Sequence, residues 1–174
     1  MVSLRADLTL KGADQRTIKN AGDRESHVWL MEQLAALRPE DPVLSEEGRD
    51  NSHRLSSSRA WIIDPLDGTA QYSSGGDDFA VHIALWQANS QSPSQICVAS
   101  VAVPTRNELW SMDEPVQRYQ PNGLPIRILV SRSRPPREIA SVIAKLEETF
   151  PERGRVEVIP MGSVGAKVGA ILSD

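Results

Sequence analysis

Three apolar segments in the middle of the chain constrain the fold more than any other feature. Residues 60–64 (AWIID), 79–87 (FAVHIALWQ) and 95–103 (QICVASVAV) have the length and apolar character of buried strands. A loop rich in Ser, Gln, Asn and Pro separates the second segment from the third, and residues 104–112 (PTRNELWSM) add a turn and a further strand. The sequence therefore predicts a meander of antiparallel strands, with Cys97 in its core.

Helical periodicity appears on both sides of this predicted sheet. Residues 24–38 have apolar positions at helical spacing, with Asp23 as a suitable N-cap and Pro39 ending the helix, whereas residues 1–22 are polar and show no clear period. A second helix is predicted within residues 135–150, which begin with two prolines. The residues expected on the buried faces are Val28, Met31, Leu34, Ala35 and Leu37 in the first helix and Ile139, Val142, Ile143 and Leu146 in the second.

The order of predicted elements changes near residue 126. Residues 126–131 (IRILVS) predict a strand, and residues 156–159 (VEVI) predict another strand after the second helix, before a final helical segment from Ser163. Strand, helix, strand and helix in this order are typical of an α/β unit. We therefore predict an α+β chain with an N-terminal metal-binding part at residues 1–125 and the start of a C-terminal α/β part at residues 126–174.

Composition limits the classes of function. Apolar residues make up 40% of the 174 residues, which is enough for a packed core, and the net charge of −4 argues against a nucleic-acid polymer as partner. A single cysteine excludes an intramolecular disulfide framework. No apolar run approaches the ~18 residues of a membrane span. We therefore expect a cytoplasmic protein without a membrane partner.

Acidic side chains mark the ends of two successive predicted strands. Asp64 and Asp67 end the segment WIIDPLD, and Glu46 and Glu47 follow the strand-like segment PVLS. Taken alone, each pair could belong to a turn or to a solvated surface. If both pairs converge on one edge of a sheet, their repulsion requires a cation, and oxygen-only ligands favour Mg²⁺ or another hard ion. Such a site suits metal-assisted hydrolysis of a phosphoester.

Several motifs carry a family resemblance. The pair LSEEG and WIIDPLDGT resembles the inositol monophosphatase superfamily, and AGDRES, VLSEEG, DDFAVHIALW, ILVSRSRPP and GSVGAKV are similar to its CysQ-type 3'(2'),5'-bisphosphate nucleotidases, particularly those of actinobacteria. The resemblance implies a layered αβαβα sugar-phosphatase fold. It also implies a lithium-sensitive, Mg²⁺-dependent phosphatase that removes the 3'-phosphate from 3'-phosphoadenosine 5'-phosphate. Inositol phosphates or sugar phosphates are further substrates of this subgroup, and a homodimer is usual in the family.

The resemblance assigns roles at the cation. The implied ligands are Glu46, Asp64, Asp67 and the backbone carbonyl of Leu66. Glu46 would also orient the nucleophilic water, whereas Glu47 would lie next to the ligands without contacting the cation.

The resemblance also implies catalytic and substrate-binding positions. Thr69 would partner the attacking water, and Asp23 would help to position the outer metal and Thr69. The positions expected to bind the small phosphate ester, whether a nucleotide bisphosphate or an inositol phosphate, are Gly68, Thr69, Ser131, Ser133, Ser163 and Lys167.

The histidines and a group of arginines have simpler interpretations. His82 alternates with apolar neighbours and is interpreted as a strand residue, whereas His27 and His53 are predicted to lie on the surface. Four arginines occur close together, at positions 127, 132, 134 and 137. They fit a solvated strand end and helix start, and the alternative is a positive rim for a doubly phosphorylated nucleotide.

Two departures from the family pattern set further expectations. A later WDxAA motif, whose aspartate completes the metal site in the family, has no counterpart here, and the long helix expected before residues 4–17 (LRADLTLKGADQRT) is missing. We therefore expect a chain truncated at both ends that binds Mg²⁺ weakly and hydrolyses 3'-phosphoadenosine 5'-phosphate negligibly by itself. The alternatives are a catalytically inactive remnant of the family and a family member that acts on fructose-1,6-bisphosphate.

Overall fold

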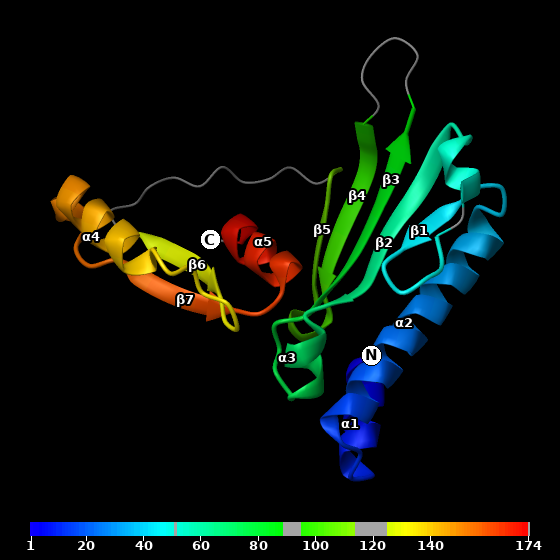
Figure 1. Cartoon of the computed structure of the whole chain (residues 1–174), viewed down its shortest axis with the longest axis horizontal. Helices are drawn as coiled ribbons and strands as arrows, with labels where there is room; N and C mark the ends of the chain where they lie inside the picture. Colours follow the sequence, from blue (N-terminus) through cyan, green and yellow to red (C-terminus); the bar gives the residue numbers. More distant parts are fainter. Residues whose placement is uncertain (51, 89–94, 114–124, 174) are drawn as a thin grey trace.

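The computed structural model describes residues 1–50, 52–88, 95–113 and 125–173. Its elements form two successive groups (Figure 1). The first group consists of α1 (Val2–Leu10), α2 (Gln15–Leu37), β1 (Val43–Ser45), η1 (Ser52–Leu55), β2 (Arg59–Asp67), α3 (Thr69–Ser73), β3 (Ala80–Gln87), β4 (Gln95–Val103), η2 (Pro104–Arg106) and β5 (Glu108–Ser111). The second group consists of β6 (Arg127–Ser131), α4 (Ile139–Thr149), η3 (Pro151–Arg153), β7 (Glu157–Met161) and α5 (Val164–Leu172).

The first group builds a five-stranded sheet in the order β1-β2-β3-β4-β5. Strands β2 to β5 pair antiparallel with their sequence neighbours, and β1 pairs parallel with β2. The meander predicted from the apolar segments is therefore confirmed. In the second group β6 and β7 pair parallel, with α4 in the connection between them, as expected for an α/β unit.

Helices cover opposite faces of the large sheet. Leu30 and Leu34 of α2 pack against Ile63 on one face, whereas Ala166 of α5 packs with Ala80 on the other. Beyond α5 lie the β6–β7 pair and then α4, so the layers follow one another as α2, large sheet, α5, small sheet and α4 (Figure 1). This order confirms the layered αβαβα fold, whereas the division into parts at residue 125 stays a prediction.

Two glycines allow α5 to lie directly on the sheet. A Cβ added at Gly165 would lie 2.6 Å from Ala80 Cβ and 2.9 Å from Val101 Cγ1, and one added at Gly169 would overlap the indole ring of Trp110. The two glycines are four positions apart, so both lie on the same face of the helix. The close approach brings the N-terminus of α5 to the end of β2.

The structure corrects the predicted start of the first long helix. Helix α2 begins at Gln15, and its N-cap is Asp14, whose side chain accepts a 2.8 Å hydrogen bond from the Thr17 amide. Asp23 lies inside the helix and is buried rather than capping it. The start of the helix was hidden because most residues preceding Asp23 are polar and face solvent, and only Ile18 and Gly22 of residues 15–22 are buried.

Several predicted core positions are also wrong. Leu30 and Leu34 face the sheet, whereas Val28 is 42% exposed and Leu37 is 66% exposed, because the helix packs through a narrower stripe than its apolar content suggests. In α4, residues 139, 143 and 146 are half-buried and Val142 is exposed. Cys97 is only half-buried; it lies at the register shift between β3 and β4, and its thiol donates to the Leu85 carbonyl.

Of the histidines predicted on the surface, His53 is exposed and His27 is half-buried. His27 turns toward β1, where its Nδ1 lies 2.9 Å from Ser45 Oγ. No helix in the described part of the chain is long and apolar enough to cross a membrane.

Candidate functional site

The end of β2 departs from regular strand geometry between its two aspartates. The pairing with β3 shifts register between Asp64 and Asp67, and Pro65, which has no N–H to contribute to a ladder, lies within the irregularity. Asp64 Oδ1 accepts a 3.1 Å hydrogen bond from the Leu66 amide. A local irregularity of this kind redirects side chains. The strand end therefore presents two carboxylates outside the normal alternation of a strand.

Gly68 joins this strand end to α3 in a conformation that suits only glycine. Its φ of 90° and ψ of 38° lie in the left-handed region. A Cβ at this position would lie 2.7 Å from the Asp78 carbonyl oxygen and 3.1 Å from Ser163 Cβ. Thr69 begins α3 immediately afterwards and is partly exposed. The turn thus brings three distant parts of the chain into contact at one glycine.

The segment AGDRES of α2 packs against this turn. Ser26 Oγ donates a buried 2.6 Å hydrogen bond to the Pro65 carbonyl. Gly22 leaves room for Leu66 and the ring of Tyr72, since a Cβ there would lie 2.9 Å from Leu66 Cδ2. Asp23, between them, is 7% exposed, and its Oδ1 is buried without a hydrogen-bond partner among the described residues. Sequence reasoning assigned a role to Asp23 and overlooked Ser26, although the i, i+4 spacing of Gly22 and Ser26 was a readable signal.

Two carboxyl groups, those of Asp64 and Asp23, are partly buried near other acidic residues. Burial, followed by the charge of Glu46, raises the pKa of Asp64 to about 6, with Asp67 adding to the rise. Burial, followed by the charges of Glu47 and Glu46, raises the pKa of Asp23 to about 6. The acidic residues of two strand ends and of α2 therefore repel one another, whereas their convergence on one cation stays a prediction. A cation placed among them would relieve that repulsion.

Asp67 has a different environment from Asp64. Burial would raise its pKa, but the interactions with His82, Ser163 and Gly165 outweigh burial and lower the pKa to about 2. Ser163 Oγ donates to Asp67 Oδ2 at 2.6 Å, and the Gly165 amide donates to the same oxygen at 2.8 Å. Asp67 is therefore held as a carboxylate by the N-terminus of α5.

His82 is a strand residue, as predicted, and it also reaches this site. It pairs with Asp64 across the β2–β3 ladder, and its Nε2 lies 3.3 Å from Asp67 Oδ2. The nearby Asp67 raises the pKa of His82 despite the burial of the ring. Sequence reasoning assigned it no place in the site because its apolar neighbours indicate only strand alternation.

The expected substrate-binding residues differ in burial and in hydrogen bonding. Ser163 is fully buried, and its hydroxyl serves both Asp67 and the Ala166 amide. Ser131 accepts from the Arg134 amide, and the neighbouring Ser133 is exposed on the same loop. The Lys167 ammonium donates to the Met161 carbonyl at 3.4 Å, so it is directed along α5 toward the end of β7.

Asp78 ties this loop to Gly68. Its carboxylate pairs with Arg132 and, at 3.2 Å, with Arg106, and its own carbonyl lies beside Gly68. Arg132 is thus bound to a buried carboxylate. The sequence had suggested either a solvated strand end and helix start or a positive rim for a nucleotide. The end of β6 and the loop after it, which carry Ser131 and Ser133, are therefore anchored next to residues 67–69, called here the DGT turn.

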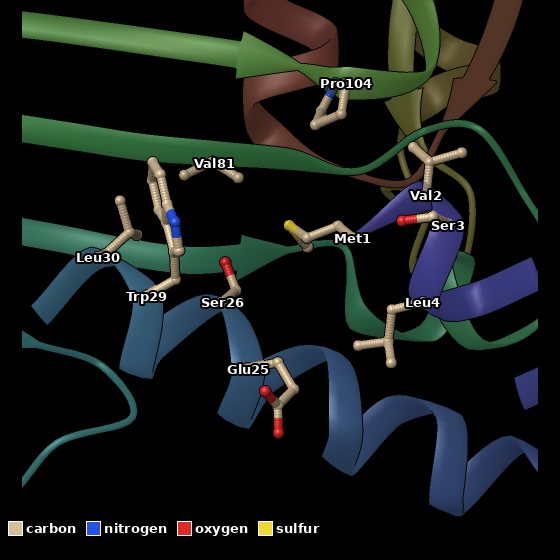
Figure 2. Close-up of a pocket in the computed structure, with 10 residues that line it drawn as sticks. All are labelled: Met1, Val2, Ser3, Leu4, Glu25, Ser26, Trp29, Leu30, Val81 and Pro104. Carbon is tan, nitrogen blue, oxygen red and sulfur yellow. The ribbon is translucent and has the colours of Figure 1, made fainter. Parts of the chain in front are cut away.

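Two hollows lie near these residues, and the smaller one is lined by two of the predicted ligands, Glu46 and Asp64. A hollow of about 590 Å³ is lined by Ser45, Glu46, Asp64 and His82 together with apolar sheet residues. A larger hollow of about 930 Å³ lies between α1, α2 and the sheet, and Figure 2 shows that apolar side chains such as Trp29 and Leu30 dominate it. Among the described residues that line it, Glu25 alone carries a carboxylate, so the lining does not match the expected chemistry.

The types of ligand atoms in this region fit a hard divalent cation, but their arrangement does not form a complete site. Available donors are carboxylate and carbonyl oxygens, two carboxyl groups have raised pKa values, and one buried Asp23 oxygen has no hydrogen-bond partner in the described part of the chain. Within the described ranges, however, no three His, Cys, Asp or Glu side chains are arranged to hold a metal ion. The residues therefore suit the cation in type and charge, without forming a complete set of ligands.

Comparison with known proteins places this site in a family. A profile of the inositol monophosphatase family matches residues 3–172. The chain belongs to the inositol monophosphatase family. The 3'-phosphoadenosine 5'-phosphate phosphatases of Mycobacterium tuberculosis and Mycobacterium bovis are each 41% identical over 177 residues, covering 99% of this chain and 62% of the relative. CysQ, the 3'(2'),5'-bisphosphate nucleotidase of Escherichia coli K12, is 31% identical over 147 residues, covering 82% of this chain and 58% of the relative.

Solved structures of family members have the same fold. CysQ from Bacteroides thetaiotaomicron is similar with a TM-score of 0.57 and 27% identity, covering 80% of this chain and 58% of that protein. Staphylococcal IMPase-II has a TM-score of 0.63 at 17% identity, covering 98% of this chain and 63% of that protein, and supports the fold alone. The chain spans about three fifths of the length of the curated relatives it matches.

Proposed function

We propose that this chain carries the cation- and phosphate-binding part of a Mg²⁺-dependent phosphomonoesterase that removes the 3'-phosphate from 3'-phosphoadenosine 5'-phosphate. The observation that carries the proposal is the environment of Asp64 at the end of β2, where burial, followed by the charges of Glu46 and Asp67, raises the pKa of its carboxyl group to about 6. Identity of 41% with mycobacterial phosphatases for that nucleotide, over 99% of this chain, supports the substrate.

The cation would be held by the acidic residues of the two strand ends. The proposed ligands are Glu46, Asp64, Asp67 and the carbonyl oxygen of Leu66. A bound divalent cation supplies a lowered pKa for the attacking water and stabilises charge on the leaving oxygen. Glu46, exposed at the turn after β1, would orient that water from one side.

The groups around the DGT turn would bind and orient the phosphate ester. The Thr69 hydroxyl would accept or donate a hydrogen bond to the water, and Gly68 would let the phosphate approach the backbone closely. Asp23 would hold Thr69 and the outer cation from α2. We propose that Ser131, Ser133 and Lys167 bind the nucleotide. Ser163, which already donates to Asp67, would lie between the cation site and the bound nucleotide.

One observation favours an alternative in which the chain binds a cation or phosphate without catalysis. Within the described residues no complete set of metal ligands is present, and catalysis by two cations requires both the attacking and the leaving oxygen to be stabilised. Inositol phosphate and fructose-1,6-bisphosphate are alternative substrates. A homodimeric assembly and a cytoplasmic location stay predictions.

Cation binding and hydrolysis should be measured separately on the 174-residue chain. Mn²⁺ binding is followed by electron paramagnetic resonance with Mg²⁺ as competitor, and phosphate release is followed with each candidate substrate, with and without Li⁺. Asp64→Asn should lose Mn²⁺ binding while keeping its secondary structure, and Asp113→Asn, at an exposed site after β5, is the matched control.

The results distinguish the candidates directly. Mg²⁺-dependent phosphate release from 3'-phosphoadenosine 5'-phosphate, lost in Asp64→Asn, supports the phosphatase. Cation binding at Asp64 without any release supports the binding-only alternative. Mn²⁺ binding that is the same in Asp64→Asn and in the parent chain would contradict the proposed site.

A further inference from the structure

His82 occupies the junction between the large sheet and α5. It lies on β3 opposite Asp64, and its Nε2 is 3.3 Å from Asp67 Oδ2. The Nε2 atom is buried, and no partner among the described residues meets it with hydrogen-bond geometry. Asp67 is therefore the group that this nitrogen faces, and their attraction is electrostatic.

One oxygen of Asp67 receives all the contacts that surround the carboxylate. Ser163 Oγ and the Gly165 amide donate to Oδ2 from the start of α5, and His82 approaches the same oxygen from the sheet. Among the described residues no hydrogen bond reaches the other oxygen, Oδ1. Contacts from two different elements thus fix the orientation of the carboxylate and leave one oxygen available.

Gly165 provides the space for the imidazole. A Cβ at Gly165 would overlap His82 Nε2 and would lie 2.6 Å from Ala80 Cβ. The ring therefore fills the gap between β3 and the first turn of α5, where any larger residue at position 165 would displace it. Because packing fixes the ring as well as the helix, His82 has a single position relative to Asp67.

We propose that His82 is a positioning residue for Asp67, which it holds through Oδ2 so that Oδ1 is presented to a divalent cation. The inference rests on the proposed function for the cation, but not for the orientation of Asp67. Residues that orient a metal-binding side chain typically contribute 10–100-fold to metal affinity. His82 would act through Asp67 without touching the cation or the substrate.

Three substitutions separate this role from simple packing. In His82→Gln the amide nitrogen can reach the place of Nε2, whereas in His82→Asn the side chain is too short to do so. His82→Leu fills the volume of the ring but places no polar nitrogen beside Asp67. We expect about tenfold or greater loss of Mn²⁺ affinity in the Leu and Asn variants and near-parent affinity in the Gln variant. His53→Leu, at an exposed site in η1, should leave the affinity unchanged.

Hydrogen exchange of the Gly165 amide provides a readout that needs no metal. An apolar side chain beside Oδ2 leaves part of a carboxylate without a polar neighbour, so Asp67 should rotate away and release the Gly165 N–H. In metal-free protein, Gly165 should therefore exchange at least tenfold faster in the Leu and Asn variants than in the parent chain and the Gln variant. If His82→Leu does not fold, His82→Asn gives the same comparison.

Each outcome decides the proposal. Loss of both Gly165 protection and Mn²⁺ affinity, rescued by Gln, supports it. Loss of Gly165 protection in the Leu and Asn variants, when the parent chain itself binds no Mn²⁺, supports the positioning role and contradicts the proposed cation site. Unchanged Gly165 protection in both the Leu and Asn variants, or equal loss in all three variants including Gln, would overturn it.

Discussion

Ser163 Oγ donates a 2.6 Å hydrogen bond to Asp67 Oδ2 across 96 residues of sequence, and it accepts from the Ala166 amide at 3.0 Å. One buried hydroxyl thus caps α5 and fixes a carboxylate at the end of β2. The two sheets of the molecule are joined at this point by polar contacts as well as by packing.

Replacing this hydroxyl should destabilise the fold. We expect Ser163→Ala to lower the free energy of unfolding by about 1–3 kcal/mol, because it removes an N-cap and one donor to the half-buried carboxylate of Asp67. Urea denaturation measures the change. Ser173→Ala, at the exposed C-cap of the same helix, is the control and should change stability by less than about 0.5 kcal/mol. Equal effects at the two serines would show that the Asp67 contact adds no stability.

Two glycines with similar backbone angles should respond differently to alanine. Gly68 has φ 90° and would place a Cβ 2.7 Å from a backbone oxygen, whereas Gly75 has φ 84° and open space around it. We expect Gly68→Ala to cost about 2–4 kcal/mol, from backbone strain and a clash that no side-chain rotation relieves, and Gly75→Ala to cost about 1 kcal/mol. Thermal and urea unfolding measure both. A cost at Gly68 no larger than at Gly75 would contradict the close contact with Asp78.

Asp23 should destabilise the metal-free protein at neutral pH. Its folded pKa of about 6 is above the usual 3.8, so the folded state binds the proton more tightly than the unfolded state. This group therefore removes stability as pH rises from about 4 to about 6, and the loss is complete above about 6. Asp23→Asn should raise the free energy of unfolding by about 1–2 kcal/mol at pH 7.5 in the presence of a chelator, with no gain at pH 4.

The measurement for Asp23 is urea unfolding of both chains across that pH range. Asp113→Asn is exposed and provides the control for a change in net charge. A stability difference between Asp23→Asn and the parent that is constant with pH would contradict the raised pKa.

Arg5 should stabilise α1 and the loop after α3 more than a surface arginine does. Its guanidinium donates to the Tyr72 and Gly76 carbonyls, and it lies 5.6 Å from the Tyr72 ring centre and 5.2 Å from that of Phe79. We expect Arg5→Lys to cost about 1–2 kcal/mol in unfolding free energy, because an ammonium cannot reproduce the planar contacts.

Arg24 provides the matched comparison for Arg5. Its side chain is 72% exposed and, among the described residues, pairs only with the neighbouring Glu25, so Arg24→Lys should change stability by less than about 0.5 kcal/mol. Comparable losses at Arg5 and Arg24 would show that the aromatic and carbonyl contacts of Arg5 do not stabilise the fold.

The central strands and the acidic turn were predictable from sequence because their signals are local. Apolar runs of strand length bounded by turn residues predicted β2, β3 and β4, and the motif WIIDPLDGT predicted carboxylates at a strand end. The start of α2 was missed because its first two turns bury only Ile18 and Gly22, too few residues to produce an apolar period. Local pattern indicates an element only where one of its faces is continuously buried.

The relations between distant residues depended on the tertiary structure. Nothing local to Asp67 distinguishes it from Asp64, yet contacts with Ser163, Gly165 and His82 lower the pKa of Asp67 while burial and Glu46 raise that of Asp64. Sequence determined which residue types could bind a cation, through their carboxylates and their placement at strand ends. Which oxygen of Asp67 is already occupied was decided by the packing of α5 on the sheet, because electrostatic energy depends on distances that only the folded chain sets.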